Sequence, residues 1–137
     1  SVADCTARYD HGVGIFLDGG STVRGCTVDY GDSDGIVAIG PSVITGNSST
    51  RNGTGTANSE IRVSGANSKI EGNTMAGNYN TGLLLIGSPN LIIGNTSQNH
   101  GTNYNISILN KVGQILDFTG SSSVIITNAN PWANIQF

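Results

Sequence analysis

The chain of 137 residues is poor in charge, in proline and in long apolar runs. Only 11% of its residues are charged and its net charge is −3, whereas about a quarter is usual. No basic patch is present to neutralise phosphates, which argues against a nucleic-acid partner. No apolar run approaches the roughly 18 residues of a membrane span, and the opening residues lack the pattern of a signal peptide.

Glycine and short aliphatic runs dominate instead. The sequence contains 20 Gly, and 36% of its residues are hydrophobic, which is too many for a disordered chain. The aliphatic residues are concentrated in short runs, at 15–17, 36–39, 83–86, 91–93 and 124–126. Gly and Asn separate these runs. This pattern predicts many short strands joined by tight turns.

A repeat of about 21 residues organises the chain. The Cys-Thr pair at Cys5 returns at Cys26, and Asn-Ser or Asn-Thr pairs take the same slot at Asn47, Asn73 and Asn95. The successive intervals are 21, 21, 26 and 22 residues, and an insertion near residues 53–58 would account for the long one. Stacked repeats of this length satisfy backbone groups between coils and align equivalent side chains.

We therefore predict an all-β fold, a right-handed parallel β-helix of about five to six coils. The coils start near residues 5, 26, 47, 73 and 95, within a single domain over 1–137. The leucine-rich repeat has a similar period, but its spaced leucine pattern is absent.

The two ends of the solenoid lead to different expectations. An irregular cap is predicted at about 119–137, with an added strand at 124–126. There Trp132 and Phe137 would cover the last coil, a role we favour over sugar stacking. The first coil has no such cover, so we expect upstream coils or self-association to cover it.

The recurring slot predicts a structural ladder. Asn47, Asn73 and Asn95 would stack with their amides bonded to each other and to the backbone. Cys5 and Cys26 take the same slot, where a free thiol acts as a small buried apolar group. A rung spacing of about 4.8 Å also permits a disulfide, although side chains that point the same way are poorly angled for one. The redox state stays open.

Chemical variety is concentrated in the first 34 residues, which hold six of the nine acidic residues. In stacked coils Tyr9 lies over Tyr30 and His11 over Asp32. Together with Arg8, the residues Tyr9, His11 and Asp32 would supply the base and the cation of a polyuronate lyase or C5-epimerase. Ordinary turn chemistry explains them as well, and we favour that interpretation. The further ligand-binding candidates are Asp10, Asp29, Tyr30 and Asp34.

Residues 29–35 match a calcium-binding loop only in part. The first ligand position would be Tyr30, and no Glu follows at the required distance. We therefore predict no metal site and no cofactor, with calcium as the single alternative. His100 lies in a predicted turn, where we expect a solvated side chain. Arg51 and Arg62 are expected to be plain solubilising charges.

Several segments resemble a known group of proteins. Residues 72–74, 77–78, 82–88 and 90–95, and the ending Asn-Pro-Trp-Ala-Asn-Ile-Gln-Phe, are similar to the right-handed β-helix repeats of the pectate-lyase-like superfamily. That group includes periplasmic copper-maturation β-helices, alginate epimerases and phage tailspikes. The resemblance implies an extracellular or cell-surface setting, or the periplasm, and a polysaccharide partner. The epimerase motif of the Asp-Pro-His-Glu type is absent, since Gly12-Val13 follows Asp10-His11.

We expect a non-catalytic module with a structural or adhesive, polysaccharide-associated role that self-assembles through its open first coil. The polyuronate lyase or C5-epimerase is the alternative from a different functional class. A segment of a trimeric fibre is the third interpretation.

Overall fold

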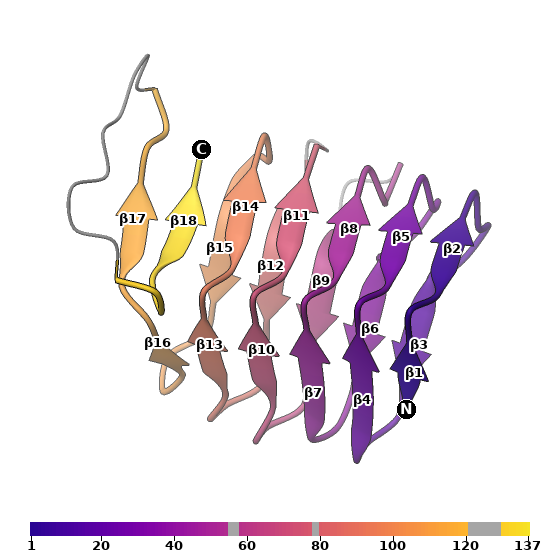
Figure 1. The fold of residues 1–137 in the computed structure, drawn as a ribbon, viewed down its shortest axis with the longest axis horizontal. Coiled ribbons are helices and arrows are strands. Elements are labelled where there is room, and N and C mark those ends of the chain that lie inside the picture. Colours follow the sequence, from indigo (N-terminus) through magenta and orange to yellow (C-terminus); the bar gives the residue numbers. More distant parts are fainter. Residues whose placement is uncertain (55–57, 78–79, 121–129) are drawn as a thin grey trace.

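The computed structural model describes residues 1–54, 58–77, 80–120 and 130–137. Its short strands form a solenoid in which successive coils contribute to three parallel sheets (Figure 1). This arrangement confirms the predicted all-β fold class and the parallel β-helix. No helix in these ranges has the length and apolar character needed to cross a membrane.

The sheets are named A, B and C, and their strands are given in spatial order. Sheet A contains β1 (Val2–Ala3), β4 (Ser21–Arg24), β7 (Ser42–Thr45), β10 (Lys69–Glu71), β13 (Leu91–Ile93) and β16 (Lys111–Val112). Sheet B contains β2 (Thr6–Arg8), β5 (Thr27–Asp29), β8 (Ser48–Thr50), β11 (Thr74–Ala76), β14 (Thr96–Gln98), β18 (Asn134–Gln136) and β17 (Ile115–Asp117). Sheet C contains β3 (Ile15–Leu17), β6 (Ile36–Ala38), β9 (Ser59–Val63), β12 (Thr81–Leu85) and β15 (Thr102–Ile106).

The strand register follows the repeat of the sequence. Ile36 pairs with Ile15 on one side and with Ile61 on the other. The third coil is longer mainly between β8 and β9, where Thr50 and Ile61 are eleven positions apart and the equivalent Asp29 and Ile36 are seven apart. The predicted insertion therefore lies in this turn, of which residues 55–57 are outside the described ranges.

The core is a set of aliphatic columns that run along the solenoid. Buried residues recur at register-matched positions of successive strands, so that burial is continuous from coil to coil. The fully buried members include Val23, Ile44, Ile70 and Ile92 from sheet A, Val28 and Met75 from sheet B, and Ile36, Ile61 and Leu83 from sheet C. Each such aliphatic side chain stabilises the fold by about 1.5–3 kcal/mol.

A column of asparagines fixes the tight turn between sheets A and B. The Asn73 Oδ1 atom accepts hydrogen bonds from the backbone N–H of Asn47 at 3.0 Å and from Asn47 Nδ2 at 3.0 Å. Asn73 Nδ2 in turn donates to Ile44 O at 2.9 Å and to Asn95 Oδ1 at 2.9 Å. The same pattern continues from Asn95 to Asn134. Asn134 is thus a rung that the sequence repeat did not reveal.

The two cysteines stand at the other end of this column. Both are free thiols, and Cys26 is buried as predicted, whereas the prediction of a buried thiol is wrong for Cys5, which is exposed. The Cys26 N–H donates to Asn47 Oδ1 at 2.9 Å, and the Cys5 N–H donates to Cys26 Sγ at 3.4 Å. The sulfur of Cys26 therefore takes the place of an asparagine amide oxygen as the acceptor of the Cys5 backbone N–H.

The last strand lies inside sheet B. β18 pairs with β14 on one side and with β17 on the other, although β17 precedes it in the chain. Part of the predicted cap is therefore a regular strand, while the predicted strand at 124–126 falls outside the described residues. Phe137 packs against Phe118 with ring centroids 5.9 Å apart, and Trp132 is 56% exposed.

Candidate functional site

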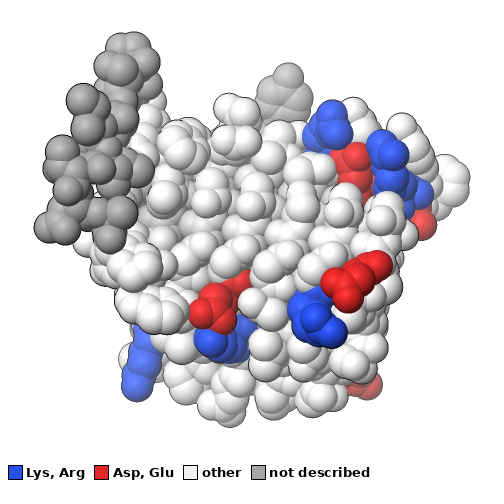
Figure 2. All heavy atoms as spheres, viewed as in Figure 1, with Lys and Arg blue, Asp and Glu red and all other residues white. Residues whose placement is uncertain are grey.

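The first three coils carry a stack of side chains on the turn that follows sheet B. Tyr9, Tyr30 and Arg51 occupy equivalent positions with positive φ angles of 57°, 60° and 55°. As predicted, Tyr9 lies over Tyr30, with centroids 5.3 Å apart and planes 11° from parallel. The Arg51 guanidinium lies 3.9 Å from the centre of the Tyr30 ring. Figure 2 shows charged groups of both signs gathered at this end, above β2, β5 and β8.

Asp29 is the electrostatic centre of this cluster. Its buried carboxylate lies 3.3 Å from Arg8 Nη2 and 3.2 Å from Arg51 Nη2, and it accepts a 2.8 Å hydrogen bond from Thr50 Oγ1. The two arginines therefore balance the negative charge of Asp29, and the Thr50 hydroxyl donates a hydrogen bond to it. Arg51 is a structural partner and not merely a solubilising charge. Because Arg8 is already paired with Asp29, a substrate carboxylate would have to compete with Asp29 for the Arg8 guanidinium.

The predicted pairing of His11 with Asp32 is present on the surface. His11 Nδ1 lies 2.9 Å from Asp32 Oδ2, and the two side chains are 97% and 49% exposed. Asp10 holds this turn through its backbone, since its carbonyl accepts the Asp32 N–H at 2.9 Å. A pair so open to water lacks the enclosure that tunes a general base.

Asp34 is buried beneath the outer face of sheet C. Its Oδ1 accepts the Ser59 N–H at 2.7 Å, and its Oδ2 lies 3.1 Å from Arg62 Nε, an ion contact whose angle does not make a hydrogen bond. Burial raises the pKa of Asp34, and these two contacts oppose the rise. Arg62 is thus a partner of Asp34, against the prediction of a plain surface charge. Nowhere in the described ranges do three His, Cys, Asp or Glu side chains converge as metal ligands.

A shallow trough follows the N-terminal ends of the sheet A strands from β4 to β16. It consists of two adjoining hollows of about 400 and 260 Å³ that share Val43 and Asn67. One hollow reaches Gly20 in the first coil and the other reaches Lys111 in the last. The remaining lining residues are Ser21, Thr22, Pro41, Ser42, Ser68, Lys69, Pro89, Asn90 and Leu91.

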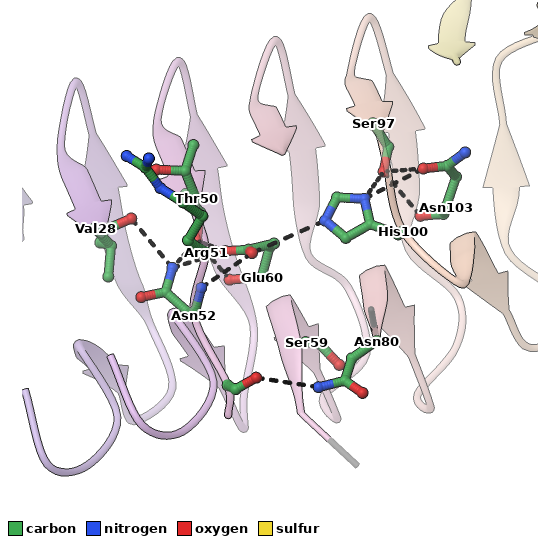
Figure 3. A network of polar contacts seen from close by, with 12 residues as sticks. Val28, Thr50, Arg51, Asn52, Ser59, Glu60, Asn80, Ser97, His100 and Asn103 are labelled. Atoms are coloured by element: carbon green, nitrogen blue, oxygen red, sulfur yellow. Dashed lines mark hydrogen bonds and ion pairs between the residues drawn. The ribbon is translucent and has the colours of Figure 1, made fainter. Parts of the chain in front are cut away.

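A polar network crosses the interior between sheets B and C (Figure 3). The prediction that His100 is solvated is wrong, because its side chain is 0% exposed. His100 Nδ1 lies 3.2 Å from both Ser97 Oγ and Asn103 Oδ1, and its Nε2 lies 3.9 Å from Glu60 Oε1. Glu60 also accepts hydrogen bonds from Asn52 and Ser49, the shortest being 2.7 Å from Asn52 Nδ2.

This network contains a serine, a histidine and a glutamate, the chemical members of a hydrolytic triad. Ser97 and the side chains of His100 and Glu60 are all 0% exposed, so no substrate can reach them in this conformation. The hydrogen bonds of Ser97, Asn52 and Glu60 satisfy polar groups inside the solenoid, whereas His100 Nε2 makes no hydrogen bond to any described residue.

Comparison with known families agrees with this geometry. Residues 2–131 match the family described as right handed beta helix region. The chain belongs to this family. No curated protein and no solved structure matches it.

Two features of this right-handed β-helix escaped the sequence analysis. Glu60 occupies the column that holds Gly35 in the coil before and Gly82 in the coil after. A glutamate at a position where the neighbouring coils have glycine is the sequence feature that could have predicted the buried network. The trough left no signal of its own, because its walls depend on the shapes of the turns between sheets C and A.

Proposed function

We propose that this β-helix module binds an extended polysaccharide along the sheet A trough and does not cleave it. The observation that carries the proposal is the course of the trough. It runs from Gly20 to Lys111 and so crosses the strands, parallel to the solenoid axis. A linear polymer lying there would meet equivalent positions rung after rung.

The lining of the trough suits sugars. Val43 and Leu91 are each 38% exposed, and with Pro41 and Pro89 they offer apolar surface to the C–H faces of pyranose rings. Hydroxyl and amide groups lie beside them, from Ser21, Thr22 and Asn67 among others. Saccharide sites combine these two kinds of contact, with polar groups fixing the orientation.

Two lysines favour an acidic polymer. Lys69 and Lys111 flank Leu91 in the strand register, so they stand two rungs apart, about 10 Å at the usual strand spacing. Lys69 is held by Glu71 at 2.6 Å. Lys111 has no ion-pair partner within the described part of the chain. Carboxylate or sulfate groups on alternate sugars would meet this spacing.

The trough offers no pair of groups for cleavage. Among the described residues that line it, Lys69 and Lys111 are the only ionisable ones, and no carboxylate is among them. This supports binding without catalysis. An extracellular, cell-surface or periplasmic location accords with such a partner and is part of the proposal.

Binding can be tested by titrating the chain with alginate, pectate and a neutral glucan, using calorimetry or affinity electrophoresis. Lys111→Ala is expected to weaken acidic-glycan binding by about fivefold, since an exposed ion pair contributes up to about 1 kcal/mol. Arg24→Ala is the matched control, because it removes one positive charge from sheet A outside the trough. Equal effects of the two substitutions, or no binding of any glycan, would refute the proposal.

The His11–Asp32 pair supports a second candidate, the polyuronate lyase or C5-epimerase. Incubation with alginate and pectate, with and without calcium, would yield unsaturated or epimerised products that the His11→Ala variant does not form. Absence of both products from the unaltered chain eliminates this candidate and leaves the binding proposal intact.

A further inference from the structure

The order of rungs in sheet B departs from the order of the chain. Asn95 precedes β14, Gln114 precedes β17 and Asn134 begins β18, and in a regular solenoid these strands would stack in the order of the chain. In the structure Asn134 stands between the other two, because β18 lies between β14 and β17. β18 therefore fills a slot that is bounded by strands on both sides.

On its β14 side, the slot is lined by backbone and side-chain groups that need hydrogen-bond partners. The carbonyls of Asn95 and Ser97 accept the N–H groups of Ile135 at 2.8 Å and of Phe137 at 3.1 Å. The backbone N–H and the Nδ2 of Asn95 both donate to Asn134 Oδ1, at 3.1 and 3.0 Å. These buried groups would lose their hydrogen-bond partners if β18 left, which is unfavourable for buried polar groups.

The β17 side of the slot cannot take over this role. Ile115 is the register partner of Asn134 and has no side-chain amide, and the Asn134 N–H donates to the Gln114 backbone carbonyl at 2.8 Å. The ladder of side-chain amides thus ends at Asn134. The slot selects a strand that begins with Asn, whereas β17 begins with Ile115.

Further contacts recognise β18 from outside its own sheet. Tyr104 Oη donates to Ile135 O at 2.9 Å, and Asn103 Nδ2 donates to Phe137 O at 3.1 Å. Both donors lie on β15 of sheet C. A strand in this slot is therefore held through its backbone by two neighbouring strands and by the adjacent sheet, and the Asn134 side chain supplies the contacts that depend on its sequence.

We propose that this slot is a strand-acceptor site and that a second copy of the chain can supply β18 to it. A second copy carries the same strand, so a reciprocal exchange would reproduce every contact described above in both subunits. The monomer and the exchanged dimer then differ in which copy supplies β18 and not in the packing of the slot. Exchange of an identical element is a low-cost route to a dimer for this reason.

Co-refolding of two differently tagged preparations of the whole chain, at high concentration and with the thiols reduced, tests this proposal. The expected product has twice the chain mass by light scattering and carries both tags. An excess of a synthetic peptide matching residues 130–137 should abolish the dimer, whereas the same peptide with Asn134→Leu should leave it unchanged.

Two results would overturn the proposal. One is a chain that refolds as a monomer at every concentration. The other is a dimer that neither peptide suppresses, or that both suppress equally, since its interface would then lie outside the slot. The glycan titrations are independent of each of these outcomes.

Discussion

Glu60 Oε1 lies 3.9 Å from His100 Nε2, although a full coil separates the two residues along the solenoid. The intervening coil places Gly82 at this position in the register. Because Gly82 has no side chain, the carboxylate and the imidazole can approach through the space that it leaves. Both side chains are fully buried, so the pair depends on its hydrogen-bond partners rather than on water.

Gly82→Ala is expected to destabilise the protein by about 1–3 kcal/mol, the usual cost of overpacking a core. A Cβ atom at this position would lie 2.1 Å from Ser97 Oγ and 2.7 Å from Asn103 O. Urea denaturation followed by circular dichroism measures the change. Gly12→Ala is the control, because its added Cβ would meet no atom within 4 Å. Equal stability of the two variants would show that the interior has room to spare at Gly82.

Asn73→Ala should cost several kcal/mol of unfolding free energy. The substitution leaves the Asn47 N–H, the Asn47 amide and the Ile44 carbonyl without their Asn73 partner, at about 1–3 kcal/mol for each buried group that becomes unpaired. Asn105→Ala is the matched control on the exposed face of β15, where a change within about 0.5 kcal/mol is expected. Comparable losses in the two variants would argue against the ladder as a source of stability.

The relationships that the sequence predicted depend on the period alone. A repeat of 21 residues suffices to place Tyr9 over Tyr30 and His11 beside Asp32, because the strands of successive coils pair in register. The asparagine column follows from the same period. These predictions required no knowledge of how any turn is shaped.

The features that escaped prediction depend on competition between segments. β18 occupies the position next to β14 that β17 would take in a regular solenoid. The spacing of Gln114 and Asn134 in the sequence does not show which of them stacks on Asn95. The burial of His100 likewise depends on a glutamate and a glycine in two other coils. Such outcomes are decided by the three-dimensional contacts of residues far apart in the repeat.

Asp34→Asn is expected to stabilise the protein at neutral pH. Burial raises the pKa of Asp34 more than the Ser59 hydrogen bond and Arg62 lower it. The folded state therefore holds this proton more tightly than the unfolded state, and the unfolding free energy falls as the pH rises through the raised pKa. The amide oxygen of the asparagine can still accept the hydrogen bond from the Ser59 backbone N–H, but the side chain carries no negative charge.

Urea denaturation of both proteins at pH 7, and again below the unperturbed Asp value of about 3.9, measures this effect. The gain of the Asp34→Asn variant should be present at pH 7 and should disappear in acid, where Asp34 is protonated in both states. A variant less stable than the parent at pH 7 would mean that the attraction of Arg62 outweighs burial.

The two thiols should differ in reactivity toward iodoacetamide. Cys5 is exposed and Cys26 is 1% exposed, so the native chain should take up one label and the denatured chain two, as counted by mass spectrometry. Desolvation, the hydrogen bond with Cys26 and the nearby charge of that thiol raise the pKa of Cys5. Because the thiolate is the nucleophile, the labelling rate of native Cys5 should reach its half-maximum at a higher pH than in the denatured chain. A lower midpoint in the native chain, or one label on each thiol before denaturation, would contradict the placement of these two residues at the end of the ladder.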